Sequence, residues 1–275
     1  MDEQALHDGI EKLGAESGAS AIGVHLFDYE TERTFSHEGD RWFHAASTMK
    51  VAVLLALFHA ASTGRVRLED RLHVRNRFRS IVDRSIFRVQ RDRDADAAVH
   101  RRVGRSMKLI ELAEPMITRS SNLATNLLLE FLTPDFIQST LTAASIDGVR
   151  VVRGVEDSVA FDRGINNTLT ARGLVSSFRL LREDRLFSEP ERRQMLNILF
   201  AQEFNSMIPS LLPDSTGVAH KTGEISTCTH DAGLVLLPGR RPYAVAILTE
   251  HPPGLDNTQK LVAKVSRLVY EFITT

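Results

Sequence analysis

A serine and a lysine stand three residues apart at the start of a long apolar run, "FHAASTMKVAVLLALFHAA", which covers residues 43–61. If a helix begins near Ser47, Lys50 lies one turn further along the same face and can contact the serine hydroxyl. Burial lowers the pKa of a lysine amine, and a neutral amine can take the proton of a serine, which is otherwise a weak nucleophile. The pattern predicts acyl transfer through Ser47, with the helix start stabilising the developing oxyanion. The alternative is structural: Ser47 caps the helix and Lys50 extends to solvent.

Two patterns further along the chain contain residue types that suit the same chemistry. "ITRSSNLATNLLL" has Ser120 and Asn122 directly before an expected helix, and "HKTGEI" has Lys221, Thr222 and Gly223 on an expected strand. Each alone is weak, because the first also suits a turn with a helix cap and the second an exposed strand. In this order along one chain, S-x-x-K, S-x-N and K-T-G are together specific for a serine hydrolase site.

On these three motifs the chain resembles the penicillin-recognising serine hydrolases, and among them the class A β-lactamases and their relatives, over most of its length. The resemblance implies that Ser47 is the acylated nucleophile, with Lys50 as its base. It implies that Ser120 passes a proton to the leaving nitrogen. It also implies an oxyanion hole formed by the backbone N–H groups of Ser47 and Glu224, each about 2.7 to 3.1 Å from the oxyanion.

The same resemblance implies a set of substrate-binding residues. Asn122 is expected to hydrogen-bond the substrate amide, and Lys221 to act electrostatically on Ser120. Thr222 is expected to hold the substrate carboxylate, beside Gly223. No cofactor is expected.

The segment that should position the deacylating water departs from the family pattern. Class A β-lactamases have E-x-x-L-N there, and "VVRGVEDSVAFDRGINN" offers Glu156 with Val159 and Ala160 in place of the leucine and asparagine. Half of the water site is therefore missing. Asp157 is a second candidate, and both acids equally suit a solvent-exposed loop.

Two other positions differ from the family. Ser121 stands in the middle of the S-D-N motif, which removes a carboxylate usually engaged in structure. Glu224 stands where the β-lactamases usually have a small residue, and its carboxylate would repel that of a substrate unless it points away. Acylation is thus better supported than deacylation.

Hydrophobic periodicity indicates the elements that must hold these residues. Apolar residues at helical spacing near both ends, next to strand-like runs at residues 20–37 and 219–251, predict one antiparallel sheet covered by terminal helices. The middle of the chain has helical periodicity. We expect an α+β fold: a five-stranded antiparallel sheet flanked by N- and C-terminal helices, with an inserted all-α lobe. Residues 1–40 and 214–275 form the sheet lobe and residues 41–213 the helical lobe, with the active site between them.

Composition excludes several other classes of function. The 275 residues carry a net charge of -1 and one cysteine, with no Cys/His cluster at zinc spacing, so neither a metal site nor a disulfide framework is expected. Residues 71–105 are rich in arginine, but Asp83, Asp92, Asp94 and Asp96 are interleaved, which favours a solvated surface over a nucleic-acid interface.

Five other side chains suit structural roles better than chemistry. Phe87 suits a core position better than a gate over the site. Cys228 reads as a buried hydrophobe, and His44 as a packed or capping residue. His230 and Asp231 read as a structural pair at a strand edge.

The sequence thus predicts a serine hydrolase that forms an acyl-enzyme at Ser47 with a small-molecule substrate, a β-lactam or an acyl ester or amide. The alternative is a penicillin-binding or sensing protein trapped as its acyl adduct. No partner nucleic acid or membrane is expected, and the oligomeric state is not indicated. The start of the chain lacks a signal-peptide pattern and no apolar run reaches the roughly 18 residues that span a bilayer, so the expected location is cytoplasmic, or periplasmic or secreted if the chain is a trimmed mature form.

Overall fold

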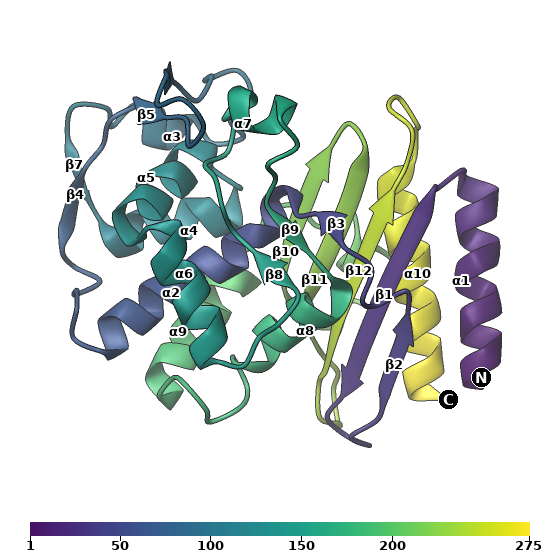
Figure 1. Cartoon of the computed structure of the whole chain (residues 1–275). Helices are drawn as coiled ribbons and strands as arrows, with labels where there is room; N and C mark the ends of the chain where they lie inside the picture. Colours follow the sequence, from purple (N-terminus) through teal and green to yellow (C-terminus); the bar gives the residue numbers. More distant parts are fainter.

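A five-stranded antiparallel sheet forms one half of the molecule in the computed structural model, which describes residues 1–275. The strands lie in the order β10-β11-β12-β1-β2, so that the two ends of the chain meet in one sheet (Figure 1). Their bounds are β1 Ala21–Asp28, β2 Thr34–His37, β10 Gly217–Ile225, β11 Cys228–Leu236 and β12 Tyr243–Glu250. The expected sheet is confirmed.

The two terminal helices, α1 (Glu3–Ser17) and α10 (Thr258–Thr274), pack side by side on one face of this sheet (Figure 1). Asp2 caps the start of α1, and Gly18 ends it in the left-handed conformation at φ 71°. Apolar residues of both helices meet the sheet in one core cluster, which includes Leu6, Ile10 and Val265. The flanking helices are therefore also confirmed.

Eight of the ten α-helices lie between β2 and β10. The helices are α2 Lys50–Ser62, α3 Ala97–His100, α4 Leu109–Thr118, α5 Asn122–Leu132, α6 Pro134–Ala143, α7 Ser158–Asp162, α8 Ala171–Arg179 and α9 Glu189–Phe200. The short strands are β3 Phe43–His44, β4 Arg71–His73, β5 Phe78–Arg79, β6 Ile86–Phe87, β7 Ser106–Lys108, β8 Val149–Arg150 and β9 Thr168–Leu169. They pair as β3-β9-β8, β4-β7 and β5-β6. The description of this region as all-helical is therefore wrong in detail, because strands of two or three residues are too short to show a period of two.

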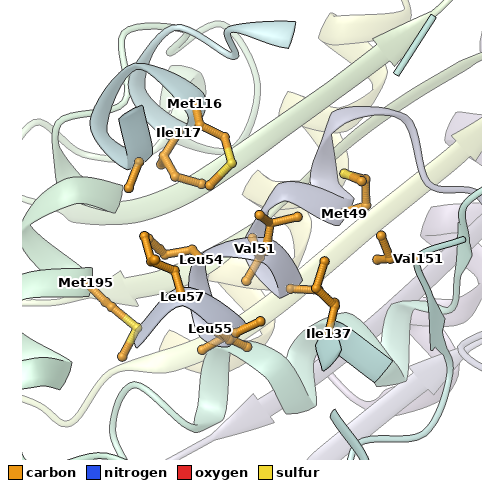
Figure 2. Packing of buried hydrophobic residues seen from close by; sticks show 14 of the residues in the cluster. Met49, Val51, Leu54, Leu55, Leu57, Met116, Ile117, Ile137, Val151 and Met195 are labelled. Atoms are coloured by element: carbon orange, nitrogen blue, oxygen red, sulfur yellow. The ribbon is translucent and has the colours of Figure 1, made fainter. Parts of the chain in front are cut away.

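Helix α2 lies at the centre of the helical region and is buried on nearly every side. Figure 2 shows its side chains, among them Leu54 and Leu57, surrounded by Met116 of α4, Ile137 of α6 and Met195 of α9. All belong to one core cluster of 51 buried residues. Because close-packed interiors resist displacement, the first turn of α2 is held at a fixed position.

The sheet and the helical region meet chiefly through α8, α9 and the 3₁₀ turn η1 (Ala46–Met49). Helix α8 packs against the sheet, and the edge strand β10 contacts both α9 and η1, which leads directly into α2. No helix in the structure combines the length and the apolarity needed to cross a bilayer.

Candidate active site

Ser47 and Lys50 lie at the junction between η1 and α2. Ser47 is in the 3₁₀ turn, Lys50 is the first residue of α2, and the lysine side chain is completely buried. The serine that the sequence placed at a helix start is thus on the turn before it, and the lysine does not reach solvent.

The Lys50 ammonium is directed at the turn that precedes α5. Its Nζ donates to the backbone O of Ser120 at 2.7 Å, to Ser120 Oγ at 3.0 Å and to Asn122 Oδ1 at 2.9 Å. It makes no hydrogen bond to Ser47 in this conformation, so the expected direct contact is not present. Three acceptors match the three N–H donors of an ammonium group, which is how the fold satisfies a buried lysine.

A second buried lysine reaches the same hydroxyl from the sheet. Lys221 Nζ lies 3.2 Å from Ser120 Oγ and donates to the backbone O of Thr222 at 2.8 Å. Ser120 therefore stands between two amines, one from each half of the molecule, and its backbone is in the left-handed region at φ 57°. Such a conformation costs free energy in a residue with a Cβ and is common at functional sites.

Both lysines are shifted toward the neutral form. Burial lowers the pKa of Lys50 well below its usual value, and the nearby Lys221 charge acts in the same direction. The carboxylates of Asp94 and Glu156 oppose this shift. Burial also lowers the pKa of Lys221 to about 7, against an opposing effect of Asp231. Amines with a pKa near neutrality can exchange protons at physiological pH.

Strand β10 brings the K-T-G residues against the nucleophile turn. A Cβ on Gly223 would lie 2.9 Å from the backbone N atoms of both Ser47 and Thr48, so only glycine fits there without displacing the backbone. Glu224 follows with an exposed side chain, and its Oε2 accepts from Gln259 Nε2 of α10 at 2.7 Å. Its carboxylate is thus held toward α10, which lessens the expected repulsion of a substrate carboxylate.

Glu156 lies within the polar network around Lys50. Its Oε1 accepts from Asn122 Nδ2 at 3.0 Å, and its Oε2 accepts from the backbone N–H of Gln90 at 3.0 Å. Asn122 therefore bridges Lys50 and Glu156 through the two ends of its amide. In the resting structure this amide is engaged by the protein, although the resemblance assigned it to the substrate.

Asp157 takes a different place from Glu156. Its carboxylate is buried and accepts from the backbone N–H groups of Ala160 at 3.2 Å and Ile81 at 3.1 Å, which caps α7. Both of its oxygens are therefore committed to structure, and the reading of Asp157 as a solvent-exposed acid is wrong. Ala160 is buried and offers no polar group.

Three contributors to the site had no clear signal in the sequence. The Asn126 side chain accepts from the backbone N–H of Val155 at 2.7 Å and donates to the backbone O of Val155 at 2.8 Å. These two hydrogen bonds fix the loop that carries Glu156. Its position one helical turn after Asn122 was the only available hint. The Gln90 N–H and the Asp94 carboxylate come from the arginine-rich segment, which sequence reasoning had read as a solvated surface.

The side chains that the sequence assigned to structural roles have such roles, but His230 and Asp231 do not pair with each other. His230 Nε2 contacts the backbone O of His44 at 2.8 Å, whereas Asp231 pairs with His220 at 2.9 Å. The expected His230–Asp231 pair is wrong because neighbouring residues on a strand face opposite sides of the sheet. Burial lowers the pKa of both His44 and His230 to about 4, and burial raises the pKa of the Cys228 thiol to about 12.

Phe87 packs against Phe78 with ring centroids 5.8 Å apart. No group of three or more His, Cys, Asp or Glu side chains converges as a metal site would require.

Comparison with known proteins agrees with this geometry. Residues 5–273 match the model of the beta-lactamase enzyme family. A beta-lactamase of Bacteroides uniformis is 28% identical over 179 residues, which is 60% of this chain and 60% of the relative's own length. Beta-lactamase AST-1 of Nocardia asteroides is 28% identical over 94% of this chain and 81% of its own length.

The fold is also found among solved structures. A mutant of PBP-A, solved as its acyl-enzyme complex with penicillin G, has a TM-score of 0.84 and 26% identity, covering 98% of this chain and 97% of that protein. With a family model that matches nearly every residue, and three motifs gathered around Ser120, the chain belongs to the beta-lactamase enzyme family.

Proposed function

We propose that this protein is a serine hydrolase that opens β-lactams, or related amides or esters, through an acyl-enzyme at Ser47. The observation that carries the proposal is the position of Ser120 Oγ, 3.0 Å from Lys50 Nζ and 3.2 Å from Lys221 Nζ. A hydroxyl between two buried amines can receive a proton from one and deliver it to a leaving nitrogen. We further propose that substrate binds where the lobes of residues 41–213 and of residues 1–40 with 214–275 meet.

Acylation in this proposal moves one proton around the site. The Ser47 Oγ–H proton passes to neutral Lys50 as the Oγ–carbon bond forms, and the carbonyl oxygen becomes an oxyanion near the N–H groups of Ser47 and Glu224. When the ring C–N bond breaks, Ser120 gives its proton to the nitrogen and regains one from Lys50. The Ser47–Lys50 hydrogen bond must form on substrate binding, as catalytic hydrogen bonds often do.

Substrate orientation falls to strand β10 and the start of α5. Thr222 and the cationic form of Lys221 suit an anionic group on the substrate, and Gly223 leaves room for its backbone to approach Ser47. Asn122 has one amide N–H beyond those already engaged and can offer it to a substrate carbonyl. Glu156 is the carboxylate available to activate water for deacylation.

The test compares hydrolysis of the chromogenic cephalosporin nitrocefin by the wild type and by Ser47→Ala. We expect the substitution to abolish turnover while leaving the thermal unfolding midpoint nearly unchanged. Equal rates for the two proteins would remove Ser47 from the mechanism.

A second candidate function is that of a penicillin-binding protein trapped as its acyl adduct. It is favoured by Ala160, which is buried and apolar where the resemblance leads us to expect a water-holding asparagine, and by the likeness to the mutant of PBP-A that was solved as an acyl-enzyme with penicillin G. Intact-protein mass spectrometry after brief exposure to penicillin G separates the two. An adduct that persists for hours favours trapping, and rapid return to the free mass favours hydrolysis.

A further inference from the structure

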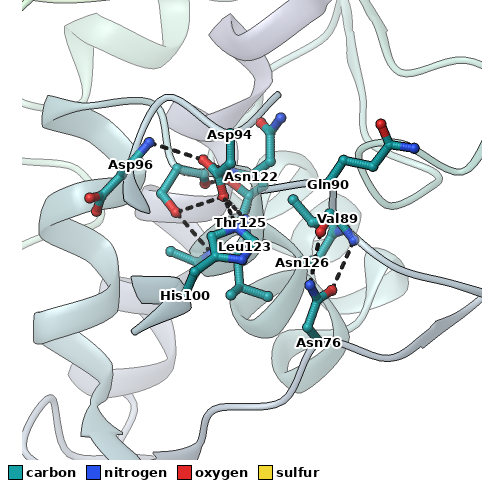
Figure 3. A network of polar contacts seen from close by, with 12 residues as sticks. Asn76, Val89, Gln90, Asp94, Asp96, His100, Asn122, Leu123, Thr125 and Asn126 are labelled. Atoms are coloured by element: carbon teal, nitrogen blue, oxygen red, sulfur yellow. Dashed lines mark hydrogen bonds and ion pairs between the residues drawn. The ribbon is translucent and has the colours of Figure 1, made fainter. Parts of the chain in front are cut away.

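A buried carboxylate from the arginine-rich segment, that of Asp94, lies at the start of α5 beside Asn122 and Leu123 (Figure 3). Asp94 Oδ1 accepts from the backbone N–H of Asn122 at 3.0 Å, and Oδ2 accepts from that of Leu123 at 2.9 Å. His100 Nε2 lies 3.0 Å from Oδ2, and Ser121 Oγ lies 3.4 Å from it. The Asp94 side chain has no exposed surface, so all of its partners are within the protein.

This carboxylate completes the start of α5. The first N–H groups of a helix have no partner inside it and carry a partial positive charge. Ser121 Oγ accepts from the N–H of Ala124, which leaves those of Asn122 and Leu123 to Asp94. A carboxylate can accept from both at once, whereas an amide side chain has only one acceptor oxygen.

The turn held in this way is the one that grips Lys50. Ser120 has a left-handed backbone at φ 57°, and its carbonyl oxygen accepts from Lys50 Nζ. Two residues later, the backbone N–H of Asn122 donates to Asp94, and the Asn122 side chain accepts from Lys50. A shift of the Asn122 backbone would therefore displace two oxygens that accept from Lys50, the Ser120 carbonyl and the Asn122 side-chain oxygen.

Asp94 also acts on Lys50 through its charge. Three other titratable groups lie around Asp94 and Lys50. Lys221 of β10 favours neutral Lys50, Glu156 before α7 and Asp94 itself favour its charged form, and His100 of α3 faces Asp94 from the other side.

The segment that carries Asp94 is anchored at several points. The Asn76 side chain pairs with the backbone of Val89 in both directions at 2.8 Å (Figure 3), and the N–H of Gln90 binds Glu156. Asp94 and the N–H of Gln90 thus bind residues of the site, whereas Asp83 and Asp92 of the same segment are exposed to solvent.

We propose that Asp94 is a positioning residue of the acylation site, which holds the Ser120–Asn122 turn and sets the charge balance at Lys50 in place of the carboxylate lost at Ser121. The proposal rests on the proposed function, since its readout is acylation. The role is assigned to Asp94 and not to Asp96, whose carboxylate caps α3 and contacts Arg119.

The test is the pH profile of acylation by a fluorescent penicillin for the wild type, Asp94→Asn and Asp28→Asn. Asp28 is the matched control, because it is buried and accepts from the backbone N–H of Glu30 but lies at the end of β1. Loss of the Asp94 charge favours neutral Lys50, so the acid limb of the profile should shift to lower pH by about 1 unit. Because the turn is also held less well, the acylation rate at the plateau should be roughly ten-fold lower. Asp28→Asn should leave the limb in place.

A carboxylate swap makes the test independent of how well the single variant folds. Asp94→Ser combined with Ser121→Asp returns a carboxylate to the same turn and should bring the acid limb back toward the wild-type pH. An unchanged limb in Asp94→Asn, an equal shift in Asp28→Asn, or a swapped variant that neither folds nor restores the limb would overturn the proposal. A wild type that no penicillin labels would instead overturn the proposed function.

Discussion

Replacing Gly223 by alanine tests how closely the sheet must approach the nucleophile. The added Cβ would lie 2.9 Å from the backbone N of Ser47 and of Thr48, and 3.1 Å from the Cβ of Ala46. Unstrained contacts between carbon and its neighbours need about 3.5 Å. Strand β10 and the nucleophile turn must therefore separate by roughly 0.5 Å to accept the methyl group.

This separation acts on the reacting atoms themselves. Misplacement by about 1 Å can cost roughly 100-fold in rate, and loss of one oxyanion donor about 100- to 1,000-fold. A movement of half that size, at the turn that supplies the Ser47 N–H, should slow acylation by about 10- to 100-fold. The free energy of unfolding should fall by about 1–3 kcal/mol, as for other overpacked sites.

The same strand offers a matched control. In Gly217→Ala the new Cβ would meet Phe200 at 3.5 Å and Leu236 at 3.7 Å, which are ordinary contacts. Rates of labelling by a fluorescent penicillin, measured below saturation at one pH, should be unchanged for Gly217→Ala and strongly reduced for Gly223→Ala. Wild-type labelling by Gly223→Ala, or an equal loss in both variants, would refute this account of the glycine.

Three further outcomes are expected. Glu156→Gln should slow deacylation by about 10²- to 10⁴-fold with much less effect on acylation, seen as a nitrocefin burst followed by slow turnover; unchanged deacylation would exclude Glu156 as the base. Lys221 has a pKa of about 7 in the folded protein and 10.5 as its ordinary value, so the unfolded chain binds more protons above pH 7 and stability rises with pH. Between pH 7 and 9 the wild type should therefore gain up to about 1.4 kcal/mol per pH unit over Lys221→Met in urea unfolding, and parallel curves would contradict the shift. Leu54→Ala, in the fully buried centre of α2, should cost about 2–5 kcal/mol, whereas Leu211→Ala at an exposed site should change stability by less than about 0.5 kcal/mol.

The sequence predicted the sheet, its flanking helices and the three motifs because each has a local signature. An apolar run such as α2 has to be buried, and the K-T-G residues had to lie on a strand between two turns. That Lys221 acts on Ser120 was implied by the family resemblance, and no spacing along the chain could have shown that Lys50 and Lys221 converge on this residue. The convergence depends on how the sheet docks against the helical region.

The parts that escaped prediction have physical reasons of their own. Asp94 and the Gln90 N–H act from a segment whose arginines dominate its composition, and a backbone N–H leaves no trace in residue identity. Asp157 and Glu156 are neighbours of the same charge type, yet one caps α7 and the other binds Asn122. Which acid turns toward the site is decided by the backbone of the loop, where Glu156 is left-handed at φ 67°.

The charge on Lys50 is set by two opposing features of the same site. Burial and the Lys221 charge favour the neutral amine that can accept a proton, while three oxygen acceptors and the carboxylates of Asp94 and Glu156 favour the ammonium. If burial acted alone, the Lys50 amine would be a weak base and would hold the Ser47 proton poorly in the first half of acylation. If the acceptors acted alone, it could not deprotonate Ser47 in the first half. A base that must also return its proton therefore needs both, which explains why a charged residue type stands at the head of an otherwise apolar helix.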